Sequence, residues 1–115
     1  MTIVYHGTKE GALAGILRRG LIPRKRKNHD ESGDYVYVER SARTARVWAT
    51  QAGSYRYVVI KLDVPDEILS RDGQTLSQSS LKASRIPAKC IKGWDIYELN
   101  VRTGEVDFVE TASRG

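Results

Sequence analysis

The sequence predicts a small α+β domain in which short helices flank a split or curved sheet. Apolar residues at helical spacing occur twice in the first half of the chain, whereas alternating and β-branched runs dominate the second half. Helices and strands do not alternate regularly, which argues against βαβ architectures. At 115 residues the chain supports one modest core, so we predict a single domain over residues 1–115.

The N-terminal residues predict a strand followed by a helix. Residues 3–5 are β-branched or aromatic and favour a strand that ends near His6. Residues 9–19 carry apolar side chains at helical spacing, with Thr8 as a candidate N-cap and Gly20 as the stop. The polar, charged stretch 24–34 follows as a predicted loop.

A second strand and helix are predicted next. Residues 35–39 form a short aromatic and β-branched run, and Ser41 is a suitable N-cap for a helix over residues 42–52. Trp48 shares one helical face with three alanines, so we expect it to be a core anchor rather than a ligand platform.

The second half predicts the main part of the sheet. Residues 55–64 are apolar on both faces, which indicates a central strand. Residues 74–84 are rich in hydroxyl and amide side chains and read as a surface excursion, after which 85–91 re-enter the fold. Residues 94–101 and 106–110 are then two strands of a hairpin.

Composition narrows the functional classes. No apolar run approaches the roughly 20 residues of a membrane span, and no secretory signal is visible, so we expect a soluble, cytoplasmic protein. The single cysteine, Cys90, cannot form an internal disulfide and is expected to be structural. With only two histidines, His6 and His29, we expect no metal site.

The basic charge indicates an anionic partner. The net charge is +5, and six of the cations lie within residues 18–27. Such a cluster suits nucleic acid or a phosphate-bearing small molecule, although a solvated basic loop explains it equally well.

The tetrapeptide Tyr5-His6-Gly7-Thr8 is the first candidate site. An imidazole, a glycine that permits close backbone approach and a hydroxyl stand together at a predicted strand end. Taken alone, the same residues also fit an ordinary hydrogen-bonded histidine beside a helix cap.

The order of motifs along the chain makes this site more specific. The motifs are YHGT at 5–8, ILRRGLIP at 16–23, Val36-Tyr37-Val38, Ala45 with Trp48-Ala49, the strand at 55–64, and the segment from Ile86-Pro87 to Ile91. This series resembles the ADP-ribosyltransferase-like superfamily, and it looks most like small bacterial and phage members and the related RNA 2′-phosphotransferases. The resemblance spans residues 3–93 and implies a split sheet that holds NAD.

The resemblance implies roles for the N-terminal motif and the second strand. His6 would hydrogen-bond the ribose hydroxyls, and the Gly7 backbone would pair with the nicotinamide carboxamide. Thr8 would assist nearby or only cap the helix. Tyr37 would place its ring against the nicotinamide. Ser41 could contact the distal ribose, and helix capping explains it at least as well.

The chain departs from the family pattern at the third catalytic group, usually a glutamate. Residues 74–90, where motif order places it, contain no carboxylate. Gln78 is the preferred substitute, because an amide oxygen can accept a hydrogen bond from a ribose hydroxyl. Glu98, Asp72 and Glu39 are further candidates.

Three functions follow as expectations. The first is an NAD-dependent mono-ADP-ribosyltransferase of toxin or phage type that modifies a protein or nucleic acid, with Arg24 and the following cations contacting the pyrophosphate or an acidic target. The second is an RNA 2′-phosphotransferase-like enzyme. The third is an inactive module of phage or mobile-element origin that binds a nucleotide, nucleic acid or host protein. The acceptor and the oligomeric state stay open.

Overall fold

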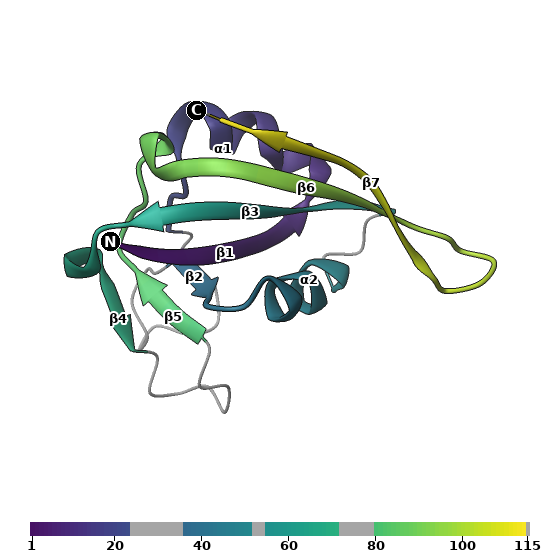
Figure 1. Ribbon diagram of the computed structural model, residues 1–115, viewed down its shortest axis with the longest axis horizontal. Coiled ribbons are helices and arrows are strands. Elements are labelled where there is room, and N and C mark those ends of the chain that lie inside the picture. The colour runs from purple at the N-terminus through teal and green to yellow at the C-terminus, as the bar shows by residue number, and fades with distance from the viewer. Residues whose placement is uncertain (24–35, 52–54, 72–79, 115) are drawn as a thin grey trace.

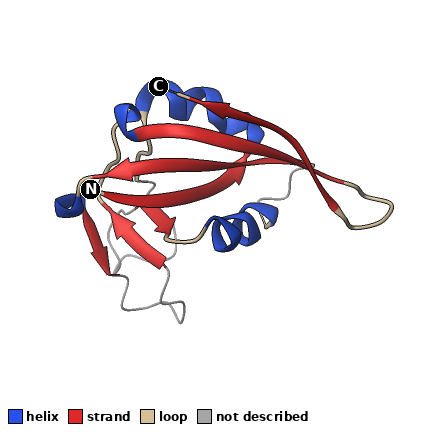
Figure 2. Cartoon of the chain, in the orientation of Figure 1, coloured by secondary structure: helices blue, strands red, loops and turns tan. Residues whose placement is uncertain are grey.

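An antiparallel sheet of seven strands forms the fold, in the order β4-β5-β2-β1-β3-β6-β7 (Figure 1). The computed structural model describes residues 1–23, 36–51, 55–71 and 80–114. The strands are β1 (Thr2–Lys9), β2 (Val36–Glu39), β3 (Arg56–Val64), β4 (Leu69–Arg71), β5 (Ser80–Ala83), β6 (Ile91–Leu99) and β7 (Val106–Ser113). The helices are α1 (Leu13–Arg19) and α2 (Ala42–Thr50), and 3-10 turns occupy Glu10–Ala12, Asp66–Ile68 and Ala88–Cys90. The predicted α+β class is confirmed (Figure 2).

The pairing between neighbouring strands is shortest between β1 and β2. These strands pair at a single position, Tyr5↔Glu39, whereas β1 pairs with β3 along its whole length, from Thr2 to Lys9. The seven strands therefore form a four-strand part, β1-β3-β6-β7, and a three-strand part, β4-β5-β2, joined at one point.

The helices cover opposite faces of the sheet. In β1 the side chain of Val4 lies in the main core, against which Leu13, Ile16 and Leu17 of α1 also pack. Gly7 is three residues after Val4, so a side chain at this position would point to the other face of the sheet. Helix α2 passes over Gly7 on that face. The two faces of β1 thus meet different helices.

The strand at 55–64 is confirmed as internal. It is β3, it lies between β1 and β6, and both faces are buried along most of its length. Its hydrophobic run on both faces is what such a position requires, because each face is covered. The hairpin of β6 and β7 is also confirmed.

The first helix begins later than predicted. β1 continues to Lys9 in register with Tyr57 of β3, and a 3-10 turn precedes the start of α1 at Leu13. The predicted cap is therefore wrong: Thr8 lies inside a strand, opposite Val58. Gly20 does end α1, with a φ of 79° that favours glycine.

Two further predictions are corrected by the fold. Residues 80–83, expected in a surface excursion, form strand β5, which pairs with β2 and buries Leu81 and Ala83. Trp48 is not a core anchor, because half of its surface (50%) is exposed. Cys90 is buried in the main core, in keeping with a structural role.

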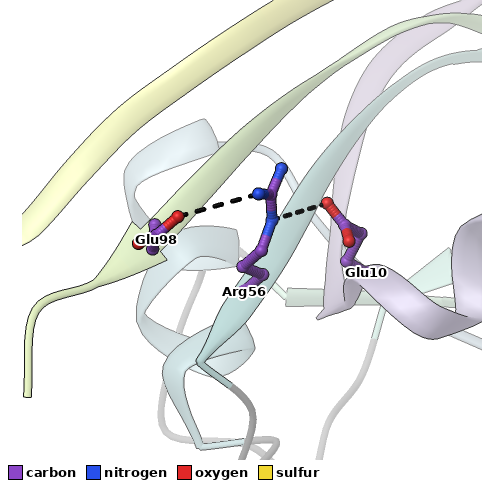
Figure 3. Close-up of polar contacts among 3 residues, drawn as sticks. All are labelled: Glu10, Arg56 and Glu98. Atoms are coloured by element: carbon purple, nitrogen blue, oxygen red, sulfur yellow. Dashed lines mark hydrogen bonds and ion pairs between the residues drawn. The ribbon is translucent and has the colours of Figure 1, made fainter.

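An ion-pair group links β3 and β6 to the start of the connection from β1 to α1 (Figure 3). The Arg56 Nε of β3 lies 2.9 Å from Glu10 Oε2, and its Nη1 lies 3.7 Å from Glu98 Oε2 of β6. Glu98 is thus engaged by a structural arginine at the far end of the sheet from the β1–β2 junction. All three side chains are substantially exposed, so each pair contributes little to stability.

Candidate functional site

His6 is tied to β2 just beyond the point where β1 and β2 stop pairing. It stands one residue after Tyr5, the last residue of β1 that is paired with β2, and opposite Ile60 of β3. Its Nδ1 lies 2.9 Å from the backbone oxygen of Tyr37. The first and second sequence motifs, 31 residues apart, are therefore joined by a direct hydrogen bond.

This hydrogen bond fixes the chemical state of the imidazole. A carbonyl oxygen can only accept, so Nδ1 carries the proton and Nε2 is the acceptor of the neutral ring. Burial lowers the pKa of His6, and the hydrogen bond to Tyr37 opposes that shift only in part. At neutral pH the ring is thus a neutral acceptor rather than a cation.

The edge of β1 that faces β2 has no strand partner from His6 to Thr8 in the described part of the chain. These residues pair with β3 on one side, while the only pairing with β2 is at Tyr5. Backbone N–H and C=O groups at such an edge can bind a ligand that offers both a donor and an acceptor.

Gly7 is required by helix packing. A Cβ at this position would lie 2.0 Å from the backbone oxygen of Ala45 and 2.8 Å from the Cβ of Ala49. Helix α2 therefore lies directly on the β1 backbone, and only glycine permits this approach. The contact of the Gly7 backbone with a carboxamide stays a prediction.

Ser41 caps α2. Its Oγ accepts a hydrogen bond from the backbone N–H of Thr44 at 3.4 Å, and its backbone oxygen accepts one from Ala45 N at 3.1 Å. The capping interpretation of this serine is thus confirmed, and its contact with a ribose stays a prediction.

The side chains of Tyr37 and His6 point to different faces of the sheet. Val36 and Val38 point into the main core, as Val4 does, so the alternate residue Tyr37 points to the face covered by α2. His6 lies in phase with Val4. The His6 imidazole contacts the backbone oxygen of Tyr37, and the two side-chain rings lie on opposite faces of the sheet near the β1–β2 junction.

Among the described residues, Glu39 is the charged residue that is buried, with 5% of its surface exposed. It pairs with Tyr5 of β1 and Ser80 of β5, and it lies on the same face of β2 as Tyr37. The sequence offered only a weak signal for it, a carboxylate at the end of an apolar strand. Within the described part of the chain, the structure places it at the one position where β1 and β2 pair.

Trp48 lies on the flank of α2 that faces β2. Ala45 and Ala49 meet Gly7, and the Arg46 guanidinium carbon lies on the β6 side, 5.6 Å from the ring centre of Tyr97. Successive helical residues are about 100° apart, so Trp48 is on the other side of the helix from Arg46. The exposed indole therefore points away from β6, on the β2 side of the helix, a placement that the sequence pattern missed.

Several predicted site residues are not placed by the structure. Gln78, Arg24 and Asp72 lie outside the described residues. Within the described ranges, no group of three or more metal-binding side chains occurs. Nor does the same part of the chain contain a helix of the length and apolarity that crossing a membrane requires.

Comparison with known proteins supports the fold. The chain is similar to a solved structure named EcPltA, with a TM-score of 0.67 and 15% identity, over 96% of this chain and 84% of that one. At this identity the likeness concerns the fold alone. No family model matches the sequence, and no curated protein matches it.

Proposed function

We propose that this protein is an NAD-dependent mono-ADP-ribosyltransferase acting on a macromolecular target. The observation that carries the proposal is the hydrogen bond from His6 Nδ1 to the Tyr37 carbonyl. It joins the two motifs of the resemblance at the one place where the sheet is nearly divided.

His6 would act as a hydrogen-bond acceptor for a ribose. Its Nε2 is the acceptor of a neutral ring, and a ribose hydroxyl is a donor of matching chemistry. The edge of β1 at Gly7, which has no strand partner among the described residues on the β2 side, would bind the nicotinamide carboxamide, which presents one acceptor and one donor group. The preformed, neutral state of His6 would need no proton transfer on binding.

Two aromatic side chains would flank the planar nicotinamide. Tyr37 is half-buried on the face covered by α2, and Trp48 is exposed on the β2 side of that helix. Planar aromatic groups stack favourably on one another, so this pair suits a flat ring.

Glu39 would supply the carboxylate that the third motif lacks. Its side chain is buried, where a negative charge acts on a neighbouring positive charge more strongly than it would in water. We assign it the stabilisation of the ribose, which becomes electron-poor in the transition state. The sequence predicts Gln78 for this role, and its side chain carries no charge.

NAD would supply the bond that breaks, between ribose C1′ and the nicotinamide nitrogen. Nicotinamide would leave as a neutral molecule with the electron pair of that bond. A nucleophilic oxygen or nitrogen of the target would form the new bond to C1′ and lose its proton to solvent. The residues of this chain bind and orient the ribose and exclude water.

The test is release of nicotinamide from NAD, measured by chromatography, with transfer of labelled ADP-ribose to the protein and nucleic-acid fractions of a cell extract. We expect His6→Ala and Glu39→Gln to lower both rates at least tenfold, while Arg102→Gln on the exposed hairpin keeps the wild-type rates. Full activity of His6→Ala would refute the proposal. NAD binding by the wild-type protein without any turnover would instead identify an inactive binding module.

A further inference from the structure

We propose that the exposed side of α2 is a binding surface for single-stranded nucleic acid. Its cations are Arg40, which precedes α2, and Arg43 and Arg46 within the helix; the exposed ring of Tyr55, just before β3, is the aromatic group that we assign to the same strand of nucleic acid. This inference does not depend on the proposed transferase activity, because binding can be measured without NAD.

The three arginines form a basic surface without acidic neighbours on the helix. All three are exposed, and the chain from residue 40 to 51 contains no aspartate or glutamate. Arg43 and Arg46 are separated by about 4.5 Å along the helix axis, because each helical residue rises about 1.5 Å. Because the Arg46 guanidinium already lies against the Tyr97 ring, Arg40 and Arg43 are the two that we assign to successive phosphates of one strand.

Helix stability does not explain these cations. Arg40 and Arg43 stand at the N-terminal end of α2, where the helix dipole disfavours positive charge. Across the described residues, neither forms an ion pair. By contrast, Arg18 and Arg19 lie in the last turn of α1, where the dipole favours cations.

An exposed aromatic ring adds the second element of single-strand binding. Tyr55 precedes β3 with 68% of its surface exposed, and its backbone oxygen accepts a hydrogen bond from Leu99 N at 2.7 Å. The backbone of this tyrosine is therefore anchored while its ring faces solvent. Unpaired bases stack on such rings, whereas bases within a duplex cannot.

Fluorescence anisotropy tests the proposal with the full-length protein and labelled 20-mers of oligo-dT and oligo-rU, beside a duplex of the same length. We expect both single strands to bind more tightly than the duplex. Arg40→Gln/Arg43→Gln should weaken binding about tenfold and reduce the slope of log K against log salt by about 1.4, the value for two phosphate contacts to a single strand.

The matched control removes the same charge from the opposite face of the sheet. Arg18→Gln/Arg19→Gln should change affinity less than threefold, although its net charge equals that of the α2 variant. Equal weakening by the two double variants would show that net charge alone drives binding and would overturn the proposed surface. Circular dichroism confirms that both variants fold.

Two further experiments test whether bases stack on Tyr55 and whether the partner is a nucleic acid or an acidic protein. Tyr55→Phe keeps the ring and should bind as the wild type does, whereas Tyr55→Ala should lose about tenfold; equal affinity of these two variants would remove Tyr55 from the surface. Polyglutamate that competes as well as an oligonucleotide of equal charge would identify an acidic protein site and contradict the proposal. So would absence of binding to either strand at 50 mM salt.

Discussion

The part-buried imidazole of His6 and the buried hydroxyl of Tyr57 show how much chemistry depends on a single hydrogen bond. The imidazole of His6 donates to the Tyr37 carbonyl, which fixes its tautomer. The hydroxyl of Tyr57 is buried under α2 without a hydrogen-bond partner among the described residues. The first is satisfied and chemically defined, whereas the second carries an energetic penalty.

His6 should make stability depend on pH. Because burial lowers the pKa of His6 in the folded protein, the unfolded chain takes up the proton first as the pH falls below about 6.5. The histidine's contribution is fully present above that value, and stability should fall by up to about 1.4 kcal/mol per pH unit below it, down to the folded pKa. Urea unfolding at a series of pH values should show this loss in the wild type and in His29→Gln, but not in His6→Asn. The same pH dependence in His6→Asn would contradict the assignment.

Tyr57→Phe should stabilise the protein. The change removes a buried hydroxyl that lacks a partner and keeps the ring that stacks on Tyr97 at 5.5 Å between centroids. We expect a gain of about 1 kcal/mol in the free energy of unfolding, measured by denaturant titration. Tyr55→Phe, at an exposed position, is the control and should be neutral. A loss of stability in Tyr57→Phe would mean that the hydroxyl is hydrogen-bonded in solution.

At the scale of elements, the close packing of α2 on β1 explains which sequence patterns were misleading. Ala45 and Ala49 lie against Gly7, and the distance leaves no room for an indole. Trp48 therefore cannot fill the interface, although it shares the apolar stripe of the helix. Periodicity gives the face of a helix, but the distance to its neighbour decides which side chains fit there.

Gly7→Ala should destabilise the protein strongly. Its Cβ would overlap the Ala45 carbonyl, so α2 would have to shift away from β1. We expect a loss of about 3 kcal/mol or more in the free energy of unfolding, at the upper end of overpacking effects. Gly11→Ala is the matched control, because nothing lies within 4 Å of its Cβ position, and it should change stability by less than about 1 kcal/mol. Similar stabilities of the two variants would exclude this packing.

For the whole molecule, the α+β class, the internal strand at 55–64 and the final hairpin could be predicted from local patterns. The extension of β1 to Lys9 and the strand at Ser80–Ala83 could not, because each depends on pairing with a distant strand. The same limit applies to the site. His6 and Tyr37 were visible as motifs, but the burial of Glu39 arises only from its neighbours in β1 and β5.

The central claim is that neutral His6 accepts a hydrogen bond from the ribose of NAD. Nitrogen-15 NMR of the two imidazoles tests it directly, because a hydrogen bond to Nε2 moves the resonance of that nitrogen. We predict that free His6 shows the Nδ1–H tautomer at pH 7 and that saturating NAD shifts its Nε2 resonance while His29 is unchanged. An Nε2 resonance of His6 that does not move with NAD, or a ring that is already protonated at pH 7, would contradict the account.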